Sequence, residues 1–265
     1  MREFNVGILQ FGATKDKEVN IRRISNLLRI DRADIVVFPE YSLFDITGLK
    51  PEEVYTLAED LDGPYVGFLK NLASEYNTYI LGTLVERSDK PPKTYNTTVL
   101  VSPDKGLIYA YRKTHLFDAY NYRESEVLLP GNELSKVVDV KGVRVGVAVC
   151  FELRFPEVIR TLALEGAEVI FIPAAWYSGS LKEETLLTLA KARAIENTLY
   201  VVIAAQYSQH FSGRSSVVDP LGVVVTDLGV GEKYREVTID LDVIDEVRRL
   251  IPTLKLRRPE LYRTS

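Results

Sequence analysis

Short apolar runs rich in β-branched residues alternate along the chain with stretches whose apolar residues recur every three to four positions. The runs predict buried strands at 6–9, 35–38, 79–84, 97–101, 143–149, 169–172, 200–204 and 223–225. The helical period predicts helices at 18–30 and 182–197, each with its apolar residues on one face. Strands that alternate with helices in this way are typical of an α/β fold.

Two segments in the first half of the chain are similar in sequence to two segments in the second half. Val6-Gly7-Ile8 corresponds to Val145-Gly146-Val147, and the segment 33–39 corresponds to 167–173 at a similar offset. Two similar strand–helix–strand units predict a four-layer α-β-β-α sandwich of two pseudo-equivalent halves. Chance similarity is the alternative, because buried strands use few residue types. No linker rich in Pro, Gly or Ser separates the halves, so we expect a single domain over 1–265.

The composition narrows the class of protein. With 46% hydrophobic and 26% charged residues, the chain is typical of a soluble globular protein and not of a disordered one. Its single cysteine cannot form an internal disulfide, and its first residues lack a basic stretch followed by an apolar segment, so we expect a cytoplasmic protein. No apolar run approaches the roughly 20 residues of a membrane-spanning helix, so we expect no membrane partner.

The charge balance argues against nucleic acid as a partner. The chain has 33 Lys and Arg against 37 Asp and Glu, a net charge of -4, and only the short segment 255–258 is locally basic. A single Met and a single Cys beside many Glu, Lys, Arg and Tyr favour a thermophilic source.

The lone cysteine stands where a nucleophile could stand. Cys150 directly follows a predicted strand and precedes Phe-Glu-Leu-Arg-Phe-Pro-Glu157, which we interpret as the start of a helix. Side chains at the carboxyl ends of strands face the crevice where α/β proteins bind ligands. We expect the helix N-terminus to lower the pKa of the thiol and to offer backbone N–H groups to an oxyanion. A buried, inert cysteine is the alternative.

Two charged residues complete the candidate chemistry. Glu40 lies at the end of the predicted strand 35–38, immediately after Pro39. Its carboxylate is therefore expected at the rim of the sheet, where it could act as an acid and a base. Lys113 lies among aromatic residues in Tyr-Arg-Lys-Thr-His-Leu-Phe, where its ammonium could bind a developing oxyanion. Taken singly, each is more often a solvated surface residue.

Other chemistries have less support. The two histidines, His115 and His210, form no zinc-binding motif, so we expect no metal site. The chain contains no Gly-x-Ser-x-Gly motif of a serine hydrolase and no glycine-rich motif of a nucleotide-binding site. A thiol protease that pairs Cys150 with a histidine stays conceivable, although no local signature of the known families is present.

The residues around these candidates resemble the three signature segments of the nitrilase superfamily of carbon-nitrogen hydrolases, in the family's order. These segments are Phe-Pro-Glu40-Tyr, Tyr-Arg-Lys113-Thr-His-Leu-Phe and Val-Cys150-Phe-Glu-Leu-Arg-Phe-Pro-Glu, and the similarity extends over nearly the whole chain, including Tyr-Asn-Thr97, 122–131, Pro-Ala-Ala-Trp176, 191–197 and 215–222. The family's fold is an α-β-β-α sandwich that pairs through its helices, so the resemblance implies at least a homodimer.

The resemblance also implies roles for individual residues. Cys150 would be the nucleophile and Glu40 the general base. Lys113 and the backbone N–H of Phe151 would stabilise the oxyanion. Glu124 would be a second glutamate that contacts the lysine and the substrate. A thioester would form on sulfur and then be hydrolysed. No cofactor and no metal are needed for this chemistry.

The substrate branch is less closely defined. Cys-Phe-Glu-Leu-Arg154-Phe-Pro is closer to small-amide and ω-amidase-like members than to the Cys-Trp-Glu-Asn of true nitrilases, although many of those members have Asp at the position of Glu152 and several have Phe at that of Trp176. Arg154 could clamp a substrate carboxylate, or it could be structural. We count Phe151, Arg154 and Trp176 as candidate substrate-binding residues.

Three functions stay open at this point. The first is hydrolysis of small aliphatic or ω-amides to acid and ammonia; the second is hydrolysis of an aliphatic nitrile by the same thiolate. The third, from a different class, is a catalytically silent scaffold for protein interaction. The substrate would be a small-molecule amide or nitrile, and the apolar tail 251–265 is expected at an oligomer interface.

Overall fold

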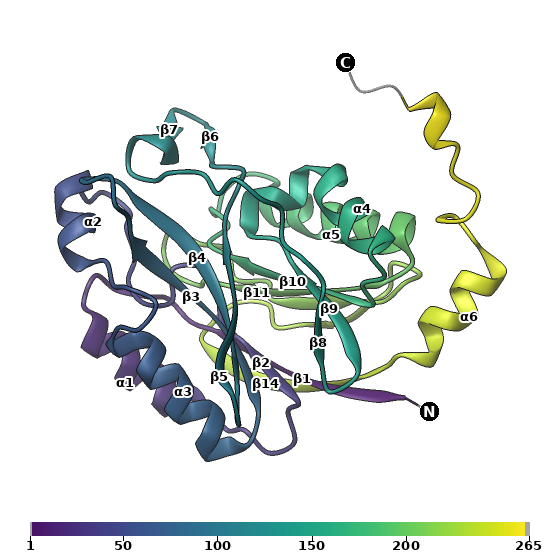
Figure 1. The fold of residues 1–265 in the computed structure, drawn as a ribbon, viewed down its shortest axis with the longest axis horizontal. Helices are drawn as coiled ribbons and strands as arrows, with labels where there is room; N and C mark the ends of the chain where they lie inside the picture. Colours follow the sequence, from purple (N-terminus) through teal and green to yellow (C-terminus); the bar gives the residue numbers. More distant parts are fainter. Residues whose placement is uncertain (1, 263–265) are drawn as a thin grey trace.

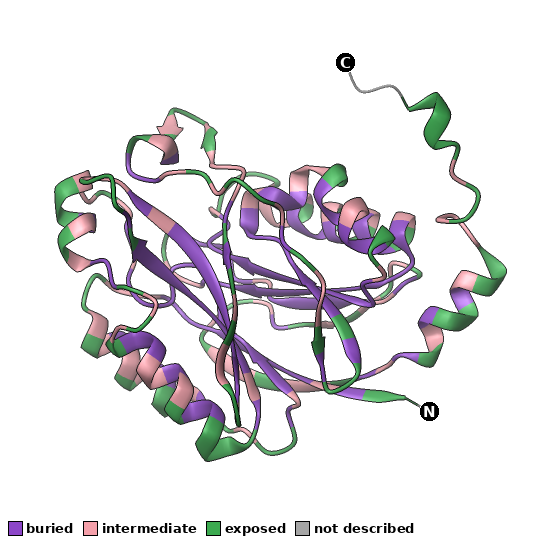
Figure 2. Ribbon diagram, in the orientation of Figure 1, coloured by how far each residue is buried: buried purple, intermediate pink, exposed green. Residues whose placement is uncertain are grey.

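The computed structural model describes residues 2–262 as two six-stranded sheets packed face to face. Helices cover the outer face of each sheet (Figure 1). Val6 and Ile8 of the first sheet belong to the same buried cluster as Val145 and Val147 of the second, so the main core lies between the sheets (Figure 2). This is the predicted four-layer α-β-β-α sandwich.

The first sheet has the strand order β14-β1-β2-β3-β4-β5. A second apolar core lies beneath its outer helices, where Ile24 of α1 and Leu69 of α3 pack with Val36 of the sheet. The bounds are β1 Glu3–Gln10, β2 Ile35–Val37, β3 Tyr79–Arg87, β4 Thr94–Ser102, β5 Gly106–Arg112, β14 Lys233–Asp240, α1 Lys17–Leu27, α2 Pro51–Leu57 and α3 Pro64–Tyr76.

The second sheet has the order β8-β9-β10-β11-β12-β13 and is covered by α4 and α5. Leu162 of α4 and Leu186 of α5 are fully buried against it. The bounds are β8 Val138–Val140, β9 Val143–Val147, β10 Val169–Ala174, β11 Tyr200–Ala205, β12 Ser216–Val218, β13 Val224–Asp227, α4 Pro156–Leu164 and α5 Lys182–Asn197.

The two sheets have the same topology, which confirms the predicted equivalence of the halves. In each, three parallel strands (β1-β2-β3 and β9-β10-β11) carry one antiparallel neighbour on one side and two on the other. The register also matches, since Val6 pairs with Ile35 and Val145 with Val169. Hence the sequence similarity between the two halves reflects two similar substructures and not chance.

A pair of equivalent carboxylates supports the same conclusion. Asp34 accepts a hydrogen bond of 2.8 Å from the backbone N–H of Asn5, next to the start of the central strand pair. At the corresponding place in the second sheet, Glu168 accepts one of 3.0 Å from the N–H of Arg144. Each carboxylate therefore holds the first parallel strand of its sheet to the second.

The structure corrects the predicted helix after Cys150. Strand β9 ends at Val147, and Cys150–Arg154 form a single 3-10 turn, η2, while the α-helix α4 begins only at Pro156. Phe155 is extended, because a residue before proline avoids the helical conformation. Cys150 therefore lies on a tight turn, and a helix does not begin at it.

Smaller elements lie at the rim and at the end of the chain. The hairpin β6 (Asp118–Ala119) and β7 (Tyr122–Arg123) precedes the 3-10 turn η1 (Glu124–Glu126). After β14, helix α6 (Asp242–Leu250) leads into a tail that contains η3 (Pro259–Leu261) and runs away from the body of the molecule (Figure 1). Within residues 2–262, no helix has the length and apolar character that a bilayer span requires.

Candidate active site

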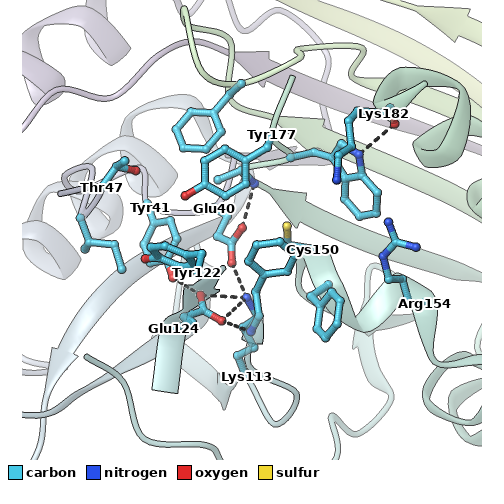
Figure 3. A pocket seen from close by; sticks show the side chains of 16 residues that line it. Glu40, Tyr41, Thr47, Lys113, Tyr122, Glu124, Cys150, Arg154, Tyr177 and Lys182 are labelled. Carbon is cyan, nitrogen blue, oxygen red and sulfur yellow. Dashed lines mark hydrogen bonds and ion pairs between the residues drawn. The ribbon is translucent and has the colours of Figure 1, made fainter. Parts of the chain in front are cut away.

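A pocket opens where strand ends and turns of both sheets meet (Figure 3). Glu40 follows β2, Lys113 follows β5, Glu124 begins η1 and Cys150 begins η2, so four distant segments supply the chemically active side chains. All four residues line this pocket, together with Tyr41, Ile46, Thr47, Phe117, Tyr122, Phe151, Arg154, Ala175, Trp176, Tyr177, Lys182 and Phe211.

Lys113 lies between two carboxylates in the wall of the pocket. Its Nζ is 2.9 Å from Oε1 of Glu40 and 2.9 Å from Oε2 of Glu124. The side chains of Lys113 and Glu40 are 1% exposed and that of Glu124 is 4% exposed. Buried ions of this kind are stable only when each finds partners of opposite charge and further hydrogen bonds.

Neutral donors hold both carboxylates in place. Glu40 accepts hydrogen bonds from the Asn96 amide, at 2.7 Å, and from the backbone N–H of Ala175, at 2.8 Å. Glu124 accepts a 2.6 Å bond from the N–H of Phe117 and another from the Tyr41 hydroxyl. Each carboxylate therefore has a fixed orientation.

The surroundings of Lys113 keep its ammonium charged. Burial by itself would lower the pKa of Lys113, but the carboxylates of Glu124 and Glu40 outweigh that effect and hold the pKa well above its ordinary value. A fixed positive charge in a site that excludes water interacts strongly with any negative charge that develops nearby.

Cys150 is a protonated thiol at rest, which corrects the expectation of a lowered pKa. Burial, followed by the negative charge of Glu40, raises the pKa of Cys150 well above its ordinary value, and the charge of Lys113 offsets only part of this. The backbone of Cys150 has a φ of 48°, in the left-handed region that residues other than glycine rarely adopt. The turn therefore presents the sulfur to the pocket instead of continuing the strand.

The outer part of the pocket is aromatic and positively charged. The Arg154 guanidinium lies 5.0 Å from the ring centre of Trp176, and the Lys182 ammonium lies 3.2 Å from that of Tyr120. Among residues 2–262, neither cation forms an ion pair with a carboxylate. Figure 3 shows both beyond Cys150, on the side away from Glu124.

The structure therefore brings together all seven residues that the sequence singled out. Glu40, Lys113, Glu124 and Cys150 are buried together in the pocket, and the partly exposed Arg154 lies over the buried ring of Trp176 at its outer wall. Phe151 also lines it, and its ring packs edge-on against Phe117 with ring centres 5.2 Å apart.

Three functionally placed residues were missed by sequence reasoning. Asn96 and Tyr41 orient the two glutamates, and Gln206 donates a 2.7 Å hydrogen bond to the carbonyl of Glu40 from the second half of the chain. Asn96 lies within the quoted segment Tyr-Asn-Thr, and Tyr41 directly follows Glu40, so adjacency to the motifs was the available signal. Nothing in the sequence marks Gln206.

A comparison with protein families identifies the chain. Residues 5–249 match the model of the family described as carbon-nitrogen hydrolase. The chain belongs to the carbon-nitrogen hydrolase family. The predicted resemblance is therefore confirmed.

Individual relatives agree with this assignment. The deaminated glutathione amidase of Rattus norvegicus is 35% identical, with 97% of this chain and 83% of the relative covered. The omega-amidase NIT3 of Saccharomyces cerevisiae is 34% identical, with 98% of this chain and 95% of the relative covered. In fold, a carbon-nitrogen hydrolase from Helicobacter pylori superposes with a TM-score of 0.91 at 23% identity, covering 98% of this chain and 97% of that one.

The charge of Glu40 can be tested through the reactivity of the thiol. Because Cys150 is the only cysteine, labelling with iodoacetamide reports on it alone. Glu40 raises the pKa of Cys150 and Lys113 lowers it, so we expect Glu40→Gln to lower that pKa and to speed alkylation at pH 8. Each unit by which the pKa falls increases the thiolate up to about tenfold while the thiol is mostly protonated.

The matched control is Glu126→Gln, which removes the same charge from an exposed position on η1. It is expected to alkylate like the wild type. Alkylation of a folded Glu40→Gln variant at the wild-type rate would show that the charge of Glu40 does not control the thiol, whereas slower alkylation would show that Glu40 acts on it mainly as a general base.

Proposed function

We propose that this protein hydrolyses amides of small carboxylic acids to the acid and ammonia, through a thioester on Cys150. The observation that carries the proposal is the convergence of one buried thiol and a Glu–Lys–Glu cluster on a single pocket. An inert thiol would not need a buried ammonium and two buried carboxylates beside it, because the desolvation of each ion costs roughly several kcal/mol.

The first half of the reaction forms the thioester. Glu40 takes the proton of the Cys150 thiol as sulfur attacks the amide carbon, and the oxygen becomes negative beside the Lys113 ammonium and the backbone N–H of Phe151. The carbon–nitrogen bond then breaks, and the nitrogen leaves as ammonia with the proton from Glu40. Glu40 is again a carboxylate, and the acyl group is on sulfur.

The second half releases the acid. Glu40 takes a proton from a water molecule, whose oxygen attacks the thioester carbon, and Lys113 again balances the negative oxygen. The carbon–sulfur bond breaks, and Glu40 returns the proton to the sulfur, which restores the thiol. Glu124 remains as the partner of the Lys113 ammonium, 2.9 Å from its nitrogen, while Glu40 carries the proton.

Amides are favoured over nitriles by the relatives. Both sequence relatives described above are named amidases, and each is similar over nearly the whole of this chain. The residues after Cys150 support the same choice, because Phe-Glu-Leu-Arg-Phe-Pro resembles the amidase-like members and not the true nitrilases.

Unpaired cations at the outer wall suggest an acidic substrate. Arg154 and Lys182 contact aromatic rings and have no carboxylate partner among residues 2–262. A guanidinium suits bidentate binding of a carboxylate. We infer that the preferred amides carry a carboxylate at the far end, held near Arg154 while the amide reaches Cys150.

The tail supports a homodimer. Large apolar side chains of the tail lie in solvent, with Ile251 50%, Leu256 72%, Leu261 62% and Tyr262 54% exposed. We propose that a second copy of this chain covers them, as the family resemblance implies for a sandwich that pairs. A tail this apolar at the end of a single 1–265 domain would otherwise be left in water.

The composition supports a proposal for the compartment and the source. We propose that the protein works in the cytoplasm, because its single cysteine forms no internal disulfide and proteins without disulfides are typical of reducing compartments. The scarcity of Met and Cys beside abundant charged residues supports a thermophilic source.

The proposed reaction is tested by supplying a matched amide and nitrile, such as butyramide and butyronitrile, and measuring ammonia and butyric acid. We expect the amide to be the better substrate and Cys150→Ala to abolish its hydrolysis. Turnover of the nitrile alone would establish a nitrilase. A folded wild type that hydrolyses neither these compounds nor succinamate, and whose thiol labels only after unfolding, would indicate the silent scaffold.

The carboxylate clamp is tested with Arg154→Ala. Hydrogen bonds to charged groups contribute about 1.5–3 kcal/mol, so we expect kcat/KM for succinamate to fall by about 10- to 100-fold. The value for butyramide, which has the same length but no charge, is expected to change little. Equal effects on the two substrates would make Arg154 structural.

The role of the tail is tested by deleting residues 251–265 and measuring sedimentation. We expect weaker association of the truncated chain, and also of Leu256→Asp. The control is Val230→Asp, which places the same charge at an apolar residue that is 67% exposed on the body. A truncated chain that sediments in the same oligomeric state as the full chain would contradict the proposed interface.

A further inference from the structure

Glu152 is a fully buried carboxylate to which the proposed reaction gives no role. It lies in η2, two residues after Cys150, and its exposed fraction is 0%. Among residues 2–262 it has no lysine or arginine partner, and its nearest ring nitrogen is Nδ1 of His115, at 3.6 Å. A carboxylate buried without a cation must be compensated by hydrogen bonds alone.

The two oxygens of Glu152 bind donors from two different segments. Oε1 accepts bonds of 2.7 Å from the Tyr111 hydroxyl, 2.8 Å from the N–H of Thr114 and 2.7 Å from the Thr114 hydroxyl. Oε2 accepts a 2.7 Å bond from the N–H of Val149. Burial alone would raise the pKa of Glu152, but the contact with His115 and the hydrogen bonds from Tyr111, Val149 and Thr114 outweigh it and lower the pKa, so the group stays ionised.

Two of these donors are the direct chain neighbours of the two reactive groups. Thr114 follows Lys113 in the chain, and Val149 precedes Cys150. The backbone of Lys113 itself bonds to Asn96 and Gly131, which lie before the second sheet in the chain. The carboxylate of Glu152 is therefore a bridge from the lysine segment of the first half to the nucleophile turn of the second.

We propose that Glu152 is a positioning residue that sets the distance between the Lys113 ammonium and the Cys150 sulfur. The proposal rests on the proposed function, because it concerns the same site. A change in that distance alters how strongly the ammonium stabilises the thiolate and the oxyanion. Arg154 belongs to the same 3-10 turn, so the spacing is measured with butyramide, which has no carboxylate for Arg154 to bind.

Glu152→Gln tests the proposal because glutamine cannot satisfy both sets of donors. Its single oxygen can face either the Thr114 group or Val149, and its NH2 group then opposes an N–H or hydroxyl donor on the other side. Misplacement of a reacting group by about 1 Å can reduce a rate by about 100-fold. We expect kcat for butyramide to fall by about 10- to 100-fold with KM within about twofold, a pattern that marks loss of transition-state stabilisation.

A second measurement reads the spacing without turnover. Lys113 lowers the pKa of the Cys150 thiol, so loosening the bridge should move the midpoint of the pH profile of iodoacetamide alkylation to higher pH. Glu152→Asp, which keeps the charge and matches the residue found in many resembling members, is expected to recover much of kcat and of the profile. Thr114→Val, which removes only one donor, should show a smaller shift in the same direction.

The control for a merely structural role is Glu59→Gln. Glu59 is also a buried carboxylate that accepts a backbone N–H, from Tyr65 at 2.7 Å, but it lies outside the pocket. It is expected to lower the unfolding midpoint in urea without changing kcat or the alkylation profile. Folded Glu152→Gln and Thr114→Val variants that both keep the wild-type kcat and profile would overturn the proposal.

The outcomes separate this inference from the proposed function. A wild type that hydrolyses no amide would refute the function, while the alkylation profiles would still show whether Glu152 couples Lys113 to Cys150. Conversely, normal amide hydrolysis with an unshifted profile in Glu152→Gln and Thr114→Val would refute only the positioning role.

Discussion

The site depends on one constraint, that an ammonium group is held charged in a place that water does not reach. Lys113 is 1% exposed, and its charge is balanced by Glu40 and Glu124, each within 3 Å of its nitrogen. Neither carboxylate could be buried without its own donors, which the Asn96 amide, the Tyr41 hydroxyl and two backbone N–H groups supply. Each such bond fixes a segment of chain, so satisfying one buried charge orders the whole end of the pocket.

The duplicated architecture explains why distant segments meet there. Both sheets are built on the same parallel core, yet corresponding strand ends carry different chemistry, since Glu40 follows Pro39 where Ala174 follows Pro173. The backbone N–H of Ala175, next to that alanine, donates to Glu40. Packing the sheets face to face turns equivalent positions toward each other, so one half contributes the carboxylate and the other completes its hydrogen bonds. A symmetric framework thus supports an asymmetric site.

Local pattern predicted the parts of this structure that local physics determines. Continuous apolar runs located the parallel strands, because these strands are buried on both faces. Helix α5 at Lys182–Asn197 has the predicted bounds, because its apolar residues recur on one face. The motifs located Glu40, Lys113 and Cys150 for the same pocket. What the pattern could not supply arises from tertiary packing: Gln206 reaches Glu40 from 166 residues away, and burial beside Glu40 reversed the expected direction of the pKa of Cys150.

The raised pKa of Cys150 determines how charge can move during the reaction. With Lys113 charged and both glutamates ionised, the cluster already carries one net negative charge, and a thiolate beside it would add a second without a second cation. The neutral thiol is therefore the resting form, and its proton must leave to Glu40 as the sulfur attacks. The negative charge that leaves Glu40 reappears on the substrate oxygen beside Lys113. The total charge of the pocket stays constant along this path and only its position changes, which a buried site of low polarisability favours over creating new charge.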